Sequence, residues 1–145
     1  MAVCELISVG TEILLGDILN TDAQFLSIEL ARLGISVIHQ STVGDNRERL
    51  LAQLKEAADR SDIIILSGGL GPTPDDLTKE VCCEFFGKKM FLHEPTVEKI
   101  KTYFSTKGME MAQNNLKQAI LPKDCVIFPN DNGTAPGMAI EKDGV

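Results

Sequence analysis

Hydrophobic positions along the chain follow two periods, one typical of strands and one typical of helices. Apolar and β-branched runs predict strands over residues 3–9, 35–43, 62–67 and 125–128. Apolar residues at helical spacing predict helices over 21–33, from 45 to about 58, 77–86, from 94 onward and 114–120. Because strands and helices alternate at short spacing, we predict an α/β fold, a three-layer α/β/α sandwich with a mainly parallel sheet.

The third predicted strand is a continuous apolar run, Ile63 to Leu66, bounded by polar residues. A run without polar alternation is typical of a strand whose two faces are both covered by helices. Sheets of this kind bind ligands at the carboxyl ends of their strands, where loops lead into helix N-termini. The loops that follow the strands are therefore where we expect chemistry.

The loop after this strand, residues 67–78, carries the strongest chemical signal. Its three glycines allow the backbone to approach a ligand closely and to present consecutive N–H groups, and its two prolines stiffen the rest. Its carboxylates and hydroxyls suit Mg²⁺ bound together with phosphate oxygens. We expect a phosphate or pyrophosphate to bind here with a divalent cation. The candidates are Gly68, Gly69, Gly71, Thr73 and Thr78 for the ligand and Asp75 and Asp76 for the metal.

A simpler interpretation is that one of the two aspartates caps the next helix and the glycines form a turn. We expect that one of them does cap. Capping does not require three glycines, two prolines and a second aspartate, however, so function is favoured for the loop as a whole. The glycine spacing is neither that of a P-loop nor that of a dinucleotide-binding turn, which excludes two common nucleotide motifs.

Two further loops supply candidate ligand-binding residues. Glu12, in the loop after the first strand, has no evident local structural role, and Thr134, after the fourth strand, offers a hydroxyl. A doubly wound sheet places such loops side by side, so we expect both of them near the loop of residues 67–78. The candidates are Gly10, Thr11 and Glu12 from one loop and Gly133, Thr134 and Gly137 from the other.

Two helix starts carry capping patterns. Thr21 and Gln24 form a capping box before the first long helix. Asp45 and Glu48 form a similar box after the second strand, so the residues alone favour Asp45 as a helix cap.

Composition narrows the choice of ligand and compartment. The chain has 145 residues, and its 14 Lys and Arg against 21 Asp and Glu give a net charge of −7 without any basic stripe, which argues against nucleic acid as a partner. Its four cysteines form no C-x-x-C pair, so a reducing cytoplasm is favoured over a zinc site or disulfides. No apolar run is long enough to cross a membrane. We expect a cytoplasmic domain that binds a small molecule.

Together these loops resemble the N-terminal domain of the competence/damage-inducible protein CinA, within the wider molybdopterin-binding superfamily of molybdenum cofactor (MoCF) biosynthesis. The resemblance runs over essentially the whole chain and rests on residues 10–12 with Gly16, Asn20 and Thr21, on 67–78 and on 133–137. Residues 115–119 also look like the family's N-x-K-Q-A stretch, although Leu116 stands where relatives commonly have an arginine.

The resemblance implies an α/β/α fold and a homo-oligomer. For the CinA branch it implies metal-dependent hydrolysis of ADP-ribose to AMP and ribose 5-phosphate, with Mg²⁺ or Co²⁺ as the metal. In the molybdopterin branch, functional aspartates match Asp76 and Asp45, so the resemblance favours a catalytic role for both. Full-length relatives carry a C-terminal domain that deamidates nicotinamide mononucleotide, and these residues do not include it.

Three functions follow as alternatives. The favoured one is a hydrolase of a nucleotide diphosphate such as ADP-ribose. The second is a domain that binds or adenylylates molybdopterin, and the third is a non-catalytic nucleotide-binding domain that regulates a nicotinamide-nucleotide deamidase.

The last residues predict an incomplete hairpin. Residues 138–141 alternate like a strand, and 142–144 form a hairpin turn whose partner strand would start at Val145. We therefore expect residues 1–145 to be a single molybdopterin-binding-like domain that is truncated at its C-terminal end.

Overall fold

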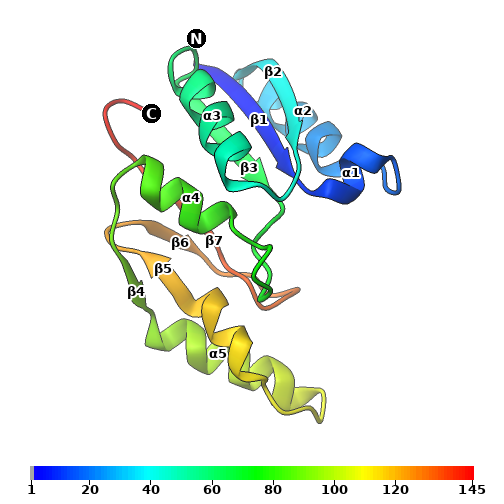
Figure 1. Cartoon of the computed structure of the whole chain (residues 1–145), viewed down its shortest axis with the longest axis vertical. Helices are drawn as coiled ribbons and strands as arrows, with labels where there is room; N and C mark the ends of the chain where they lie inside the picture. The colour runs from blue at the N-terminus through cyan, green and yellow to red at the C-terminus, as the bar shows by residue number, and fades with distance from the viewer. Residues whose placement is uncertain (1) are drawn as a thin grey trace.

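A computed structural model describes residues 2–145, and its first half is built on a three-stranded parallel sheet (Figure 1). The strands are β1 (Val3–Val9), β2 (Ser36–Val43) and β3 (Ile63–Ser67), in the order β2-β1-β3. Ser8 lies opposite both Thr42 and Ser67, so all three strands end at the same edge of the sheet. The predicted parallel sheet is confirmed, with each of these strands within one residue of its predicted bounds.

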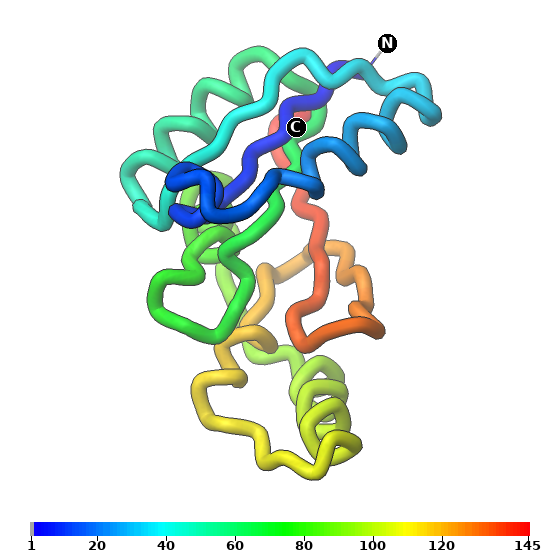
Figure 2. The backbone as a smooth tube through the Cα atoms, turned by 90° about the vertical axis from the view of Figure 1, so that its right-hand side faces the viewer, coloured from blue at the N-terminus to red at the C-terminus, as the bar shows by residue number. Residues whose placement is uncertain are grey.

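Helices cover both faces of this sheet, as Figure 2 shows on either side of β1. On one face, α2 (Thr21–Arg32) packs on Cys4 and Leu6. On the other, α3 (Arg47–Ala58) and α4 (Thr78–Phe85) enclose a core that includes Ile7, Val9 and Val81. The residues of β3 pack alternately into both cores, which is why its sequence is apolar throughout. The predicted three layers are confirmed.

The helix caps differ from those predicted by sequence. The side chain of Asn20, not Thr21, caps α2 by accepting from the amide of Ala23, and Asn46, not Asp45, caps α3. Leu77 stands at the cap position of α4 without a side-chain bond, so neither Asp75 nor Asp76 caps that helix. Thr21 does not cap because it is already the first residue of α2, and Asp45 and Asp76 do not cap because their carboxylates are bonded to Thr11 and Thr73.

The second half of the chain forms smaller units beside the sheet. Strands β4 (Met90–Leu92) and β5 (Ile120–Pro122) pair antiparallel, next to α5 (Glu94–Thr106) and the 3₁₀ helix η1 (Gln113–Ala119). Val97 and Ile100 of α5 pack with Ala119 of η1 in a small core of their own. The sequence did not predict β4 or β5, because three residues are too few to display a period.

The predicted fourth strand exists, but it lies outside the parallel sheet. β6 (Val126–Phe128) pairs antiparallel with β7 (Gly137–Ala139) as a separate hairpin. The predicted turn that follows also forms, since Lys142 and Val145 exchange two backbone hydrogen bonds of 3.0 Å. Among residues 2–145, no helix is long and apolar enough to span a membrane.

Candidate functional site

Three loops leave the sheet at the edge where its strands end (Figure 1). They begin at Gly10 after β1, at Gly44 after β2 and at Gly68 after β3. The amide of Gly10 donates to the carbonyl of Val43 at 2.9 Å, which joins the first two loops directly. Parallel pairing thus brings residues from three distant parts of the sequence to one place, as the sequence predicted.

The first pair of candidates, Thr11 and Asp45, forms a contact between two of these loops. Thr11 opens a short helix, α1 (Thr11–Leu15), where the sequence predicted only a loop. Its amide and hydroxyl both donate to Oδ2 of Asp45, at 3.0 and 2.8 Å, and its hydroxyl oxygen accepts from the Asp45 amide at 3.2 Å. The Asp45 carboxylate therefore holds α1 at the end of β2. Because it is bonded to Thr11, this carboxylate does not cap α3.

Asp76 makes a similar contact within the loop of residues 67–78, which we call the glycine loop. Its Oδ2 accepts from the amide and the hydroxyl of Thr73, at 2.9 and 2.6 Å. Burial acts to raise the pKa of the Asp76 carboxyl, but hydrogen bonds from Thr73 and the Gly71 amide, with the charge of Lys117, hold that pKa below its usual value. Asp76 is therefore an anion that closes its own loop. The exposed Asp75 lies beside it in the loop.

The loop glycines make room for other groups of the protein. Gly68 has φ +92°, and a Cβ there would lie 2.0 Å from the carbonyl oxygen of Val9. A Cβ on Gly69 would lie 2.2 Å from the hydroxyl oxygen of Thr78, and that hydroxyl donates to the carbonyl of Gly68 at 2.8 Å. A Cβ on Gly71 would meet the carboxylate of Asp76. The neighbouring backbone at Gly68 and the positive φ of Gly69 thus require glycine, whereas a side chain at Gly71 would displace the Asp76 carboxylate.

A support for the glycine loop comes from η1, which sequence reasoning did not assign to the site. The ammonium of Lys117 donates to the carbonyls of Thr73, at 2.6 Å, and of Asp76. Lys79, buried in α4, donates to the carbonyl of Lys117 at 2.6 Å, and its burial lowers its pKa. The sequence signal was the resemblance of residues 115–119 to the family's N-x-K-Q-A stretch, which contains the polar pair Lys117 and Gln118. Such a pair could have indicated side chains that satisfy a buried loop.

The third predicted loop does not join the other two in the way expected. Gly133 and Thr134 lie in the connection between β6 and β7, outside the parallel sheet. Within residues 2–145, neither donates to nor accepts from the glycine loop. Asn130 closes this connection locally by donating to the carbonyl of Ala135 at 3.0 Å. Although β6 pairs with β7 rather than with β3, Gly137 lines the same groove as Leu70 and Thr78. Ligand binding by Gly133, Thr134 and Gly137 stays a prediction.

The donor set suits a hard cation held largely by water and ligand phosphates. Residues 2–145 contain no cluster of three or more His, Cys, Asp or Glu side chains that could form a protein cage for a metal. Mg²⁺ needs no such cage, because one or two carboxylates with phosphate oxygens and water suffice. Asp45 and Asp76 each engage Oδ2 and have lone pairs left for a cation or a bound water.

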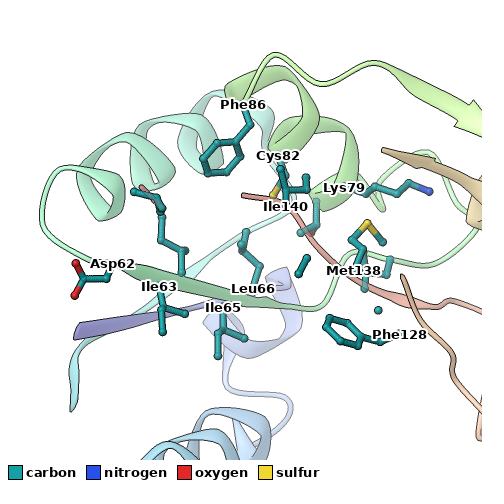
Figure 3. Close-up of a pocket in the computed structure, with 16 residues that line it drawn as sticks. Asp62, Ile63, Ile65, Leu66, Lys79, Cys82, Phe86, Phe128, Met138 and Ile140 are labelled. Atoms are coloured by element: carbon teal, nitrogen blue, oxygen red, sulfur yellow. The ribbon is translucent and has the colours of Figure 1, made fainter. Parts of the chain in front are cut away.

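A separate groove of about 510 Å³ runs between β3 and the β6–β7 hairpin (Figure 3). Its walls are mostly apolar, with Ile63, Ile65 and Leu66 on one side and Phe128 and Met138 on the other. It touches the glycine loop only through Leu70 and Thr78. The Thr78 hydroxyl already donates to Gly68, so the groove is a poor place for a phosphate.

Comparison with known proteins agrees with this architecture. Residues 5–144 match a family described as a probable molybdopterin binding domain. This chain belongs to the molybdopterin-binding domain family. The structure of the protein CinA from Thermoplasma acidophilum superposes with a TM-score of 0.87 at 32% identity, over 98% of this chain and 84% of that one. The resemblance to CinA that the loops suggested is therefore confirmed.

Other members of the family match over the same residues. A competence-damage inducible protein of Clostridioides difficile (strain 630) is 58% identical over 140 residues, which are 97% of this chain and 34% of that protein. The chain thus spans about a third of the length of that relative. MoaB of Thermus thermophilus, a molybdopterin biosynthesis enzyme, is only 20% identical, over 84% of this chain and 79% of that one, and its TM-score of 0.58 shows a shared fold.

Proposed function

We propose that this molybdopterin-binding-family domain hydrolyses the pyrophosphate bond of a nucleotide diphosphate of the ADP-ribose type. The observation that carries the proposal is that the loop bearing Asp45 and the glycine loop bearing Asp76 both leave the sheet at the edge where its parallel strands end. The substrate class is the one that the loop resemblance to the CinA branch implies. The reaction consumes one water and yields AMP and ribose 5-phosphate.

The chain's own residues would have distinct tasks. The backbone amides of the glycine loop would hold phosphate oxygens, as would the amides at the start of α4, which no side chain caps. Glu12, whose carboxylate lies over Gly10, would orient the sugar or a water at the rim. Asp45 would accept a proton from the attacking water.

A divalent cation, Mg²⁺ or Co²⁺, would be held by Asp76 with Asp75 or Asp45, and it would neutralise charge on the phosphoryl oxygens. Asp76 is suited to a cation because its lowered pKa keeps it ionised. The hydrogen bonds from Thr73 fix its orientation. Thr78 is reassigned from ligand binding to loop support, because its hydroxyl donates to the carbonyl of Gly68.

The test is to incubate the chain with ADP-ribose and either Mg²⁺ or Co²⁺ and to measure AMP and ribose 5-phosphate. Asp76→Asn and Asp45→Asn should each lower kcat/KM by at least about 100-fold, since each removes a charge from the reacting centre. Glu110→Ala, an exposed acidic residue on the second half of the chain, is the matched control and should keep full activity. Equal rates in wild type and both asparagine variants would refute the proposed roles.

The family match also keeps molybdopterin binding as a second candidate. Binding of molybdopterin, with transfer of an adenylyl group from ATP, would favour it. Nucleotide binding without turnover under any metal would instead favour a regulatory domain.

A further inference from the structure

β3 has the composition of a central strand but the burial of an edge strand. Its run from Ile63 to Leu66 is apolar throughout, yet every residue of β3 is only partly buried, whereas six of the seven residues of β1 are buried. In the order β2-β1-β3, only one edge of β3 is paired among residues 2–145. The amide and carbonyl groups of its other edge point toward the groove described above.

The groove follows this edge of β3 rather than one of the faces of the strand. Successive residues of a strand point to opposite faces, so a pocket on one face would be lined by alternate residues. This groove is lined instead by the consecutive residues 62–66, and its opposite wall by the consecutive residues 137–140. It therefore lies between two strand edges, that of β3 and that of β7 on the side away from β6. Within the described residues, no backbone hydrogen bond joins β3 to β7.

The two edges run in opposite directions. In Figure 3, Met138 lies toward the carboxyl end of β3, and Ile140 lies farther back, toward Asp62. A strand between the two edges would thus run parallel to β3 and antiparallel to β7. Such a strand would join the three-stranded sheet and the β6–β7 hairpin into one sheet, in which it would stand between β3 and β7.

The turn after β7 directs the chain into the groove. Lys142 and Val145 exchange two backbone hydrogen bonds of 3.0 Å, which close this turn, and Val145 itself lines the groove. Figures 1 and 2 both show the chain after β7 running back to the end of the sheet where β1 begins. A segment that continues from Val145 would enter the groove at that end. The chain spans about a third of the length of the Clostridioides difficile relative, so such relatives have residues to supply this segment.

The walls of the groove define the side chains that this strand must carry. Cys82 and Phe86, at the end of α4, close the groove on one side, and Phe128 of β6 closes it on the other. Figure 3 shows the two phenylalanines on opposite sides of β3. A strand that alternated apolar and polar residues would bury polar groups against one of these walls. The strand must therefore be apolar on both faces, as β3 is.

We propose that the groove between β3 and β7 accepts a further strand, an extended segment that continues from Val145 and is apolar on both faces. This inserted strand pairs parallel with β3 and antiparallel with β7. It completes one sheet of six strands. The inference does not rest on the proposed hydrolysis, so either can fail without the other.

The first test compares the chain of 145 residues with the same chain extended after Val145 by Thr-Val-Ile-Val-Val-Thr. Amide hydrogen exchange over residues 63–66 and 137–139 should slow at least about tenfold in the extended chain, because both strand edges become paired. The matched control extension is Thr-Val-Pro-Val-Pro-Thr, which has the same length but lacks two amide donors. It should leave the exchange unchanged. Equal protection by the two extensions, or by neither, would overturn the proposal.

A change inside the groove provides the second test. Ile140→Glu in the extended chain places a charge beside the inserted strand and should remove the protection of residues 63–66. The control is Val126→Glu, which changes an exposed residue of β6 outside the groove lining and should keep that protection. Circular dichroism checks that both variants fold. Loss of protection in both variants, or in neither, would contradict the proposed site.

Other occupants of the groove would give different results. A pocket for a small apolar molecule would bind the dye ANS equally well in the original and the extended chain, whereas we expect the extension to displace the dye. A groove that takes a second copy would show protection of residues 63–66 that rises with concentration in the original chain. We expect no such rise between about 1 and 100 µM. Either of these alternative results would overturn the proposal.

Discussion

Two aspartate–threonine pairs of the same chemistry do different work in this domain. Asp45 and Thr11 are 34 positions apart and join two elements, whereas Asp76 and Thr73 are three positions apart and close one loop. In both pairs a threonine amide and hydroxyl donate to a single carboxylate oxygen. The comparison teaches that the Asp45–Thr11 pair holds α1 against the end of β2, while the Asp76–Thr73 pair sets the shape of a single loop, which Lys117 also supports.

The largest effect should come from the glycine at the base of the loop. Gly68→Ala places a Cβ 2.0 Å from a carbonyl oxygen of β1, and neither backbone can move without breaking the sheet. We expect a loss of about 3 kcal/mol or more in the free energy of unfolding, measured with urea.

The matched control is Gly34→Ala. Its φ of +75° is also positive, but no atom lies within 4 Å of the added Cβ, so we expect a loss of about 1 kcal/mol. Equal losses at the two glycines would show that the contact with β1 is unimportant.

Removal of the Lys117 ammonium, which supports the glycine loop, should have the next largest effect on stability. Lys117→Met removes the ammonium that donates to the carbonyls of Thr73 and Asp76, and we expect about 2 kcal/mol of destabilisation. Proteolysis of the native protein should then cleave within residues 70–76 faster than in the wild type. Lys117→Arg keeps the charge and should lose less, and unchanged cleavage in Lys117→Met would argue against a role in loop support.

The long-range pair should contribute less to stability. Asp45→Ala should cost about 1–2 kcal/mol, and a double-mutant cycle with Thr11→Val should give a coupling energy of about 1 kcal/mol. Asn46→Ala, which removes the true cap of α3, should cost about 1 kcal/mol without any coupling to Thr11. Coupling of Thr11 to Asn46 instead of to Asp45 would contradict the assignment.

The smallest effect should appear in the pH dependence of stability. The pKa of Asp76 is lowered in the folded protein, so its ionised form adds stability that is complete above the carboxyl pKa of the unfolded chain, about 4. That stability is lost as the pH falls through the lower folded pKa. Between pH 5 and 2, the wild type should therefore lose more stability than Asp76→Asn. Parallel curves for the two proteins would rule out this linkage.

Much of the fold was predictable because it depends on local patterns. The run from Ile63 to Leu66 identified a strand covered on both faces, and helical spacing located α2 and α3. β4 and β5 were not predictable, since strands of three residues carry no period. The alternation of residues 138–141 did predict a strand at β7, but its pairing with β6 is decided between distant segments.

The candidate site divides in the same way. The glycine loop and its aspartates could be recognised because three glycines and two carboxylates are more than a turn and a helix cap require. The roles of single residues could not be predicted. Asp45 and Asp76 matched the pattern of helix caps, whereas in the structure they accept hydrogen bonds from Thr11 and Thr73. Lys117 could not be assigned at all, because its partners lie about forty positions away.

The sequence by itself determined the parallel sheet, its two helical layers and the loop that carries glycine and aspartate, since each follows from local periodicity or local composition. Only the tertiary structure decided which carboxylate meets which hydroxyl, which lysine supports the loop, and which edge of β3 faces the groove. These depend on contacts between segments far apart in the chain. Hydrogen bonds of that kind form wherever the fold brings a donor to an acceptor, and no spacing in the sequence records them.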